Sequence, residues 1–247
     1  MKGSEKDKKI EHVCCASSVC TMARFAREAG FTCEDVKYYK SDCELLFIEP
    51  GEFIFHQFGI AEGIFCLQTG NVMLWHLDEL GNEIGFRVAG EGDIVGHRAC
   101  FGEDPHAASA VALTDCVVCH LHKHTLTLLM DKYPALPRLF LRLLARDRGP
   151  PDSLMLRNTY LPVKVRLINL LMILKRSVAV QDNNGVLVFE LPISRREIST
   201  MIATRPETVT RIIGELNRDG LVHFKERTIT IPDMERLKEA ATEHEVY

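Results

Sequence analysis

Cysteine is the residue type that offers the most chemistry in this chain of 247 amino acids. All nine cysteines lie at or before Cys119, and the N-terminal ones crowd together: Cys14, Cys15, Cys20, Cys33 and Cys43. The count is odd, and residues 1–10 are polar and lysine-rich, which is not the pattern of a secretory signal. We therefore expect no disulfide framework, and we look for thiol or metal chemistry in the front half of the chain.

The cysteines separate into two groups by their surroundings. Free cysteine behaves as a small apolar residue, so we expect Cys66, Cys100 and Cys116 to pack in the core. The N-terminal stretch looks polar and exposed, and three interpretations of its cysteines stay open. They are ligands of an iron–sulfur cluster, which needs four thiolates, or thiols that are oxidised reversibly, or residues without a chemical role.

Histidines form a second candidate set, at His56, His76, His97, His106, His120, His122 and His124. The last three alternate in the run HLHKH. Alternate residues of a strand share a face, so this spacing is compatible with a metal or haem site. We interpret these histidines more simply as partly exposed strand residues.

Two hydrophobic patterns divide the chain. From Leu45 to about Leu121, short apolar runs alternate with turn residues such as Thr69-Gly70-Asn71, which predicts an antiparallel β domain. Helical spacing begins near His124. It includes an apolar stripe that stops at the helix-breaking sequence Gly149-Pro150-Pro151 and consists of Leu136, Leu139, Phe140, Leu143 and Leu144.

The segment from Ile193 to Leu221 predicts a helix-turn-helix. Ser194 and Glu197 are spaced as a capping box, and Pro206 occupies the favoured first turn of the second helix. Gly220 marks the end of that helix, whose inward residues are expected to be Val209, Ile212, Ile213 and Leu216. The alternating sequence LVHFKERTITI follows, and we interpret it as a β-hairpin wing.

The outer face of the second helix carries residue types that read base pairs. Glu207 and Arg211 are four residues apart, with Thr210 beside them. Arginine suits O6 and N7 of guanine, and glutamate accepts from N4 of cytosine, so this face predicts DNA reading. The plainer alternative is an exposed salt bridge between Glu207 and Arg211. Further DNA contacts are expected from Arg205, Ser194 and Lys225.

Charge supports this placement. Residues 191–227 hold seven basic and five acidic side chains, a net charge of +2, whereas the whole chain carries −4. There is no Gly-rich phosphate loop, HExxH motif or nucleophile elbow, so we do not expect an enzyme. No apolar run is long enough to cross a bilayer, and we expect a cytoplasmic protein with no membrane partner. The alternative class is a ligand-binding module whose helix-turn-helix contacts proteins.

The chain from about Leu45 to Pro232 resembles the Crp/Fnr family of transcription regulators. The segment ETVTR, Glu207–Arg211, is similar to the family's recognition sequence. Thr210 before the arginine and Pro206 before the glutamate favour the FNR branch. The resemblance implies an α+β fold: an N-terminal β-roll sensor, which is a jelly roll like that of cyclic-nucleotide-binding domains, a dimerisation helix, and a C-terminal winged helix-turn-helix.

The resemblance also implies boundaries and partners. The expected parts are a cysteine-rich segment 1–44, a β-roll 45–130, a dimerisation helix 131–161 that is broken at 149–151, and a DNA-binding domain 162–247. The break departs from the family's continuous helix, while Leu136–Leu144 and Leu154–Leu161 are left for dimerisation. The implied partners are a second copy, a TTGAT-type palindrome in double-stranded DNA, and RNA polymerase.

The residues expected to bind the signal depart most from the family patterns. Where the cyclic AMP branch has Gly-Glu and Arg-Ser-Ala, this chain has Gly96-His97 and Ala108-Ser109-Ala110, so no cyclic nucleotide is expected. The FNR branch holds an oxygen-labile 4Fe–4S cluster. The resemblance implies these ligands here: Cys119 inside the roll and Cys14, Cys15 and Cys20 before it, with Cys33 as a substitute. It thus implies sensing of oxygen, nitric oxide or redox state, with haem, cysteine thiols, a small organic effector or no cofactor as alternatives.

Overall fold

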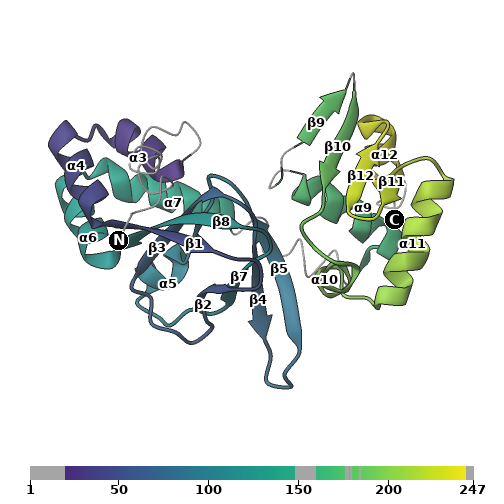
Figure 1. Ribbon diagram of the computed structural model, residues 1–247, viewed down its shortest axis with the longest axis horizontal. Coiled ribbons are helices and arrows are strands. Elements are labelled where there is room, and N and C mark those ends of the chain that lie inside the picture. The colour runs from purple at the N-terminus through teal and green to yellow at the C-terminus, as the bar shows by residue number, and fades with distance from the viewer. Residues whose placement is uncertain (1–19, 148–159, 176–177, 179, 184, 243–247) are drawn as a thin grey trace, which may run out of the picture. The chain divides into compact units, whose positions relative to one another are not determined.

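The structure, a computed structural model, describes residues 20–147, 160–175, 178, 180–183 and 185–242. These residues form two compact units. The first holds the described residues up to Val72 together with residues 89–147. The second holds Met73–Val88 and the described residues from Tyr160 onward. Figure 1 labels the helices and strands of both.

An antiparallel four-stranded sheet forms the centre of the first unit (Figure 1). Its order is β1-β8-β3-β6, with β1 at Cys43–Ile48, β8 at Cys116–His122, β3 at Gly63–Thr69 and β6 at Ile94–Val95. In this register Cys119 lies opposite Leu45 on one side and Cys66 on the other. Strand β8 is buried on both faces, since both Val118 and Cys119 are buried.

A second sheet has the order β2-β7-β4-β5. The strands are β2 at Phe53–Phe55, β7 at Ser109–Ala112, β4 at Val72–Leu77 and β5 at Glu83–Ala89, and the short helix α5 spans His97–Gly102. The predicted turn after β3 depends on Gly70, which has a φ of 88°. A Cβ there would lie 2.4 Å from the carbonyl oxygen of Asp115, so the turn requires glycine.

Two helices precede the sheet, α3 at Thr21–Ala29 and α4 at Cys33–Asp42. The expectation of a polar, exposed segment is wrong from Cys20 onward, because Cys20, Met22 and Phe25 are all buried. The reason is the helical spacing of Met22, Phe25 and Ala26, which places them on one apolar face.

One hydrophobic cluster joins α3 and the sheet to two later helices, α6 at Lys123–Lys132 and α7 at Ala135–Asp147. Phe25 of α3 meets Phe140 of α7 edge to face, with 5.1 Å between the ring centroids. The N-terminal helix is therefore part of the core of the first unit.

A polar contact fixes α4 against α6 and the residue after it. The carboxylate of Asp35 accepts a hydrogen bond from Lys132 Nζ at 2.7 Å and others from the hydroxyls of Tyr133 and Thr32. These interactions hold the pKa of Asp35 well below its usual range, the hydrogen bond from Lys132 being the largest cause. The ionised form of Asp35 is thus the form that links the helices.

The predicted dimerisation helix is only partly described. Pro134 lies between α6 and α7, and Leu136, Leu139 and Phe140 are buried in the cluster described above. These three residues of the predicted dimer stripe therefore pack within the chain, because α3 covers them. Leu141 is 64% exposed. The predicted break at 149–151 and nearly all of Leu154–Leu161 lie outside the described residues.

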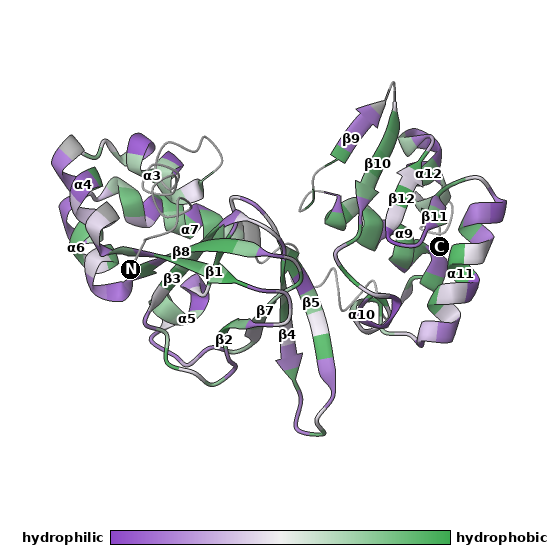
Figure 2. Ribbon diagram, in the orientation of Figure 1, coloured by the Kyte–Doolittle hydropathy of each residue, from purple (hydrophilic) through white to green (hydrophobic). Residues whose placement is uncertain are grey.

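The second unit contains a sheet of order β11-β12-β10-β9 with helices around it (Figure 1). Its elements are α9 at Val163–Leu174, β9 at Val180–Asn183, β10 at Val186–Glu190, α10 at Arg195–Met201, α11 at Pro206–Arg218, β11 at His223–Lys225, β12 at Thr228–Ile231 and α12 at Met234–Thr242. Figure 2 shows hydrophobic and hydrophilic residues interleaved along α11. The sheets and helices of the two units confirm the predicted α+β fold class.

Candidate functional site

The start of α10 is held by the capping box that the sequence predicts. Ser194 N donates to Glu197 Oε2 at 2.5 Å, and Glu197 N donates to Ser194 Oγ at 3.3 Å. A cap of this kind stabilises a helix by roughly 1 kcal/mol. Ser194 is exposed, so its hydroxyl both caps the helix and faces solvent.

The turn between α10 and α11 has an anchor that sequence reasoning missed. Arg166 of α9 donates from Nη1 to the carbonyl oxygens of Ile202 at 2.7 Å and Ala203 at 3.2 Å. These carbonyls end α10 where Ala203 adopts a φ of 48°, so the guanidinium satisfies acceptors that the helix leaves open. Arginine 36 residues before its acceptor gives no local sequence signal.

Helix α11 has one apolar face and one polar face. The predicted inward residues are confirmed, since all four are buried: Val209, Ile212, Ile213 and Leu216. The side chains of Arg205, Glu207, Thr210 and Arg211 are exposed near the N-terminal end of the helix. Because its inner face is packed, α11 is held in place, and its polar side chains face solvent.

The exposed side chains do not pair as the plainer alternative expected. Arg211 forms its ion pair with Glu215, one turn further along α11, and not with Glu207. Residues four positions before and after Arg211 both neighbour it on the helix surface, so α11 offers Arg211 two carboxylates. The Thr210 hydroxyl donates to the Pro206 carbonyl at 3.1 Å. Glu207 remains exposed in the first turn.

The predicted wing is a β-hairpin. Strands β11 and β12 are antiparallel, with Lys225 opposite Thr228, and Glu226 takes a φ of 56° in the two-residue turn. Lys225 is exposed beside this turn. The Arg227 carbonyl accepts from Leu191 N at 2.9 Å, which ties the wing to the chain before α10.

The described candidate cysteines of the first unit are buried together. Cys20 and Cys119 are 2% and 3% exposed and belong to the cluster that also holds Cys66 and Cys100. Cys20 lies at the N-cap of α3, where its sulfur accepts from Ala23 N and from Gln68 Nε2, both at 3.5 Å. Cys14 and Cys15 lie outside the described residues, as does the side chain of Cys33.

The other predicted core cysteines behave as packed thiols. Cys66, Cys100 and Cys116 are all buried, which confirms the expectation. Burial raises the pKa of the Cys100 and Cys116 thiols, so the protonated form is favoured at neutral pH. No three cysteine sulfurs of the described chain lie within 4.8 Å of one another.

The histidines depart from their sequence interpretation. His120 is buried in β8 and His122 is half-buried, whereas His124 is exposed in α6 and not in a strand. The interpretation as partly exposed strand residues is therefore wrong for His120 and His124. Phe65 of β3 covers the His120 ring, stacked at 4.4 Å between centroids.

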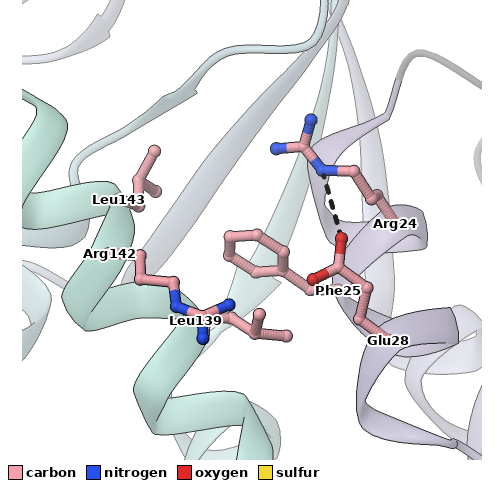
Figure 3. A pocket seen from close by; sticks show the side chains of 6 residues that line it. All are labelled: Arg24, Phe25, Glu28, Leu139, Arg142 and Leu143. Atoms are coloured by element: carbon pink, nitrogen blue, oxygen red, sulfur yellow. Dashed lines mark ion pairs between the residues drawn. The ribbon is translucent and has the colours of Figure 1, made fainter.

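A shallow groove of about 250 Å³ lies between α3 and α7 (Figure 3). Phe25 and Leu139 form its apolar floor, and Arg24, Glu28 and Arg142 lie around it. Arg24 and Glu28 form an ion pair at 3.9 Å, drawn as the dashed line in Figure 3. Both charged and apolar side chains therefore line this groove.

Two family models match this chain in succession. A cyclic nucleotide-binding domain matches residues 45–133, and a Crp-like helix-turn-helix domain matches residues 165–240. The chain belongs to the Crp/Fnr family. Members of this family are DNA-binding transcription regulators, and the helix-turn-helix described above is the DNA-binding part of this Crp/Fnr protein.

Relatives agree with this assignment. The chain is 27% identical over 197 residues to the fumarate and nitrate reduction regulatory protein of Escherichia coli strain K12, covering 78% of this chain and 77% of the relative. The protein of the same name from Salmonella typhimurium strain LT2 is 28% identical over 193 residues, 77% of this chain and 75% of the relative.

Solved structures share the fold. FixK2 from Bradyrhizobium japonicum aligns with a TM-score of 0.70 at 23% identity, over 80% of this chain and 96% of that one. A CRP/FNR-family transcriptional regulator from Thermus thermophilus aligns with a TM-score of 0.66 at 24% identity, over 81% of this chain and 100% of that one. None of the described helices is both long and apolar enough to span a membrane.

The two positions that the sequence comparison with the cyclic AMP branch singled out are both buried. His97 and Ser109 are 2% and 4% exposed, and Ser109 Oγ accepts from Gln57 N at 2.9 Å. Ala108 and Ala110 flank this serine. That no cyclic nucleotide binds here stays a prediction.

Proposed function

We propose that this chain is a dimeric, sequence-specific regulator that reads a TTGAT-type palindrome with the exposed face of α11. The observation that carries the proposal is the position of Glu207, Thr210 and Arg211 on the N-terminal half of a helix whose other face is buried. The N-terminal half of such a helix is the part that reaches base edges in the major groove. We infer a cytoplasmic location, since the ligand is DNA, and a regulatory role without catalysis.

Each side chain has a role in this proposal. Arg211 donates to O6 and N7 of guanine, and Glu207 accepts from N4 of cytosine. Glu215 pairs with Arg211 and orients the guanidinium before DNA is bound. Arg205, Ser194 and Lys225 lie at exposed positions around α11 and the wing, where they contact the backbone phosphates.

Binding to a TTGAT palindrome tests this part of the proposal. Fluorescence anisotropy would compare the full-length chain on the palindrome and on a scrambled duplex of equal length and composition, at several salt concentrations. We expect preference for the palindrome at every salt concentration. Equal binding to both duplexes, or none to either, favours a helix-turn-helix that contacts proteins.

Dimerisation is proposed through the exposed side of α7 and the chain that follows it. The exposed Leu141 supports this face, because the opposite side of α7 is buried within the chain. Two copies would then present two α11 helices to half-sites about one helical turn apart. RNA polymerase is the further partner that we propose for such a regulator.

The signal is proposed to be oxygen, nitric oxide or redox state, sensed by a 4Fe–4S cluster. The support is the burial of Cys20 and Cys119 in one cluster of side chains and the 27% identity to the fumarate and nitrate reduction regulatory protein. Cys20, Cys119, Cys14 and Cys15 would hold the cluster, with Cys33 as a substitute. When bound, the cluster would supply an oxygen-sensitive set of iron–sulfide bonds.

Residues of this chain support that role without being ligands. Gln68 and the amide of Ala23 donate to the Cys20 sulfur, and hydrogen bonds to cluster sulfurs tune reduction potential. Two of the four proposed thiolate ligands, Cys20 and Cys119, lie in the same cluster of buried side chains. The remaining thiolates belong to residues outside the described range.

Iron and acid-labile sulfide, measured on protein purified without oxygen, test the cluster. We expect about four irons and four sulfides per chain and a visible spectrum that air bleaches. Cys119→Ser should abolish both. Cys116→Ser is the matched control on the same strand and should leave the cluster intact. A protein without iron, or with a haem spectrum, contradicts this assignment and leaves the DNA proposal untouched.

A further inference from the structure

Strands β1 and β8 lie side by side (Figure 1). The start of β1 and the end of β8 bring together two imidazoles and a carboxylate. Glu44 of β1 lies directly opposite His120 of β8 in the antiparallel register. His122 follows two residues later on β8, so it shares a face of the sheet with His120. One ligand atom from each of the three residues lies within 4.8 Å of the other two.

His120 has an unsatisfied nitrogen inside the protein. The residue is 6% exposed, and its Nε2 is buried with no hydrogen-bond partner in the described chain. Buried polar atoms are nearly always paired, so an orphaned nitrogen requires an explanation such as an ion. Gly63 of β3 lies beside it, and a Cβ there would lie 2.8 Å from this Nε2. The strand therefore carries no side chain at the place where one would press against the nitrogen.

The ring of His120 is fixed by stacking. Phe65 covers one face at 11° between the planes, and the His122 ring lies 4.4 Å away at 62°.

We propose that Glu44, His120 and His122 bind one divalent transition-metal ion of the zinc class. Two imidazoles and a carboxylate form a donor set that zinc accepts, with a fourth position left for water. Zinc–ligand distances of about 2.0–2.1 Å place tetrahedral donors roughly 3.3 Å apart. Glu44 is exposed and His122 is half-buried, so both have room to close the remaining distance onto the fixed His120.

The ion would connect β1 to the junction between β8 and α6. His122 is the N-cap residue of α6 and makes no side-chain capping bond, so its ring is available to a ligand. Binding would cross-link β1 to the point where β8 ends and α6 begins. The site uses no cysteine. Cys119, a proposed iron–sulfur ligand, directly precedes His120 on β8, and successive residues of a strand point to opposite faces of the sheet.

Zinc and cobalt binding to the full-length chain tests the proposal. Protein stripped with a chelator would be titrated with Zn²⁺ against a competing dye, and with Co²⁺ as a spectroscopic probe. The variants are Glu44→Gln and His122→Asn, because asparagine is favoured at a helix N-cap and should preserve α6. His124→Asn is the matched control, since His124 is exposed two residues away and is not one of the three proposed ligands.

The wild type and His124→Asn should bind one more equivalent of metal than Glu44→Gln and His122→Asn. Loss of a residue that only hydrogen-bonds to a metal ligand weakens metal binding by up to about 100-fold. Loss of a direct ligand should therefore weaken zinc binding at this site by at least about 100-fold. The Co²⁺ bands lost in the two variants should lack thiolate charge transfer, and Zn²⁺ should raise the melting temperature only where the site is intact.

The cysteines are the same in all four proteins, so metal bound by thiols cancels in the comparison. Equal stoichiometry and affinity in wild type, Glu44→Gln and His122→Asn would overturn the proposal. So would a Co²⁺ spectrum that reports thiolate ligands alone.

Discussion

In the first unit the side chains with the most chemistry lie inside the core, whereas in the second they stand on its surface. Cys20, Cys119 and His120 are 2%, 3% and 6% exposed. Arg205, Glu207 and Arg211 of the second unit are exposed around a helix whose other face is packed. Signals such as oxygen are small enough to reach a buried site, while a DNA duplex must be met at the surface. Burial therefore separates the residues proposed to sense the signal from the residues proposed to read DNA.

The largest expected effect comes from emptying the packed face of α11. Leu216 is fully buried, so Leu216→Ala should lower the free energy of unfolding by about 2–5 kcal/mol. DNA binding should fall because the helix is lost as a platform. Urea denaturation followed by circular dichroism measures this. A loss below about 0.5 kcal/mol would mean that the exposed face of α11 does not depend on the packing beneath it.

The second effect concerns the anchor of the turn. Arg166→Ala removes the donor to the Ile202 and Ala203 carbonyls and also the donor to the Leu161 carbonyl. A hydrogen bond to a charged group contributes about 1.5–3 kcal/mol. We expect a destabilisation in this range, with weaker binding to specific and scrambled DNA alike. Lys164→Ala, on the same helix and facing Asp219, is the control and should change DNA binding less. Unchanged DNA affinity in Arg166→Ala would remove this residue from the account of the surface site.

The third effect is a pH dependence in the first unit. The pKa of Asp35 is lowered in the folded state, so its contribution is present above the unfolded pKa of about 4 and is lost as pH falls through the folded value. Asp35→Asn should therefore destabilise the chain at pH 7, and its difference from wild type should shrink below pH 4. Chemical denaturation at pH 7, 5 and 3.5 checks this. A difference that grows on acidification would contradict the role of the carboxylate.

Local signals made the helix-turn-helix predictable. The Ser194–Glu197 box, Pro206 at the start of α11 and the apolar spacing of Val209 to Leu216 each act within a few residues, and all are present. The contact of Arg166 with the turn was not predictable, since it joins residues far apart in sequence. Arg211 pairs with Glu215 and not with Glu207. Both carboxylates are four residues from Arg211, so the spacing alone does not predict which of them forms the ion pair.

The sensor unit was less predictable for the same reason. A short N-terminal helix with apolar residues among polar ones resembles a surface segment until its partner is known. Once α3 packs against α7, Phe25 and Phe140 become core, and the stripe predicted for dimerisation is partly covered. Likewise, the burial of His120 follows from Phe65 on a strand more than fifty residues away.

Whether Arg211 distinguishes guanine from adenine tests base reading by α11 directly. Anisotropy at one fixed salt concentration would compare wild type, Arg211→Ala and the control Arg218→Ala, at the other end of α11, on a TTGAT palindrome and on one with guanine replaced by adenine. Wild type and Arg218→Ala should discriminate by about 1–3 kcal/mol per half-site, and Arg211→Ala should lose that discrimination. Reading by this face of α11 would be contradicted if Arg211→Ala still bound the guanine duplex more tightly. It would also be contradicted if the wild type bound both duplexes with the same affinity and Arg211→Ala bound both more weakly by the same factor.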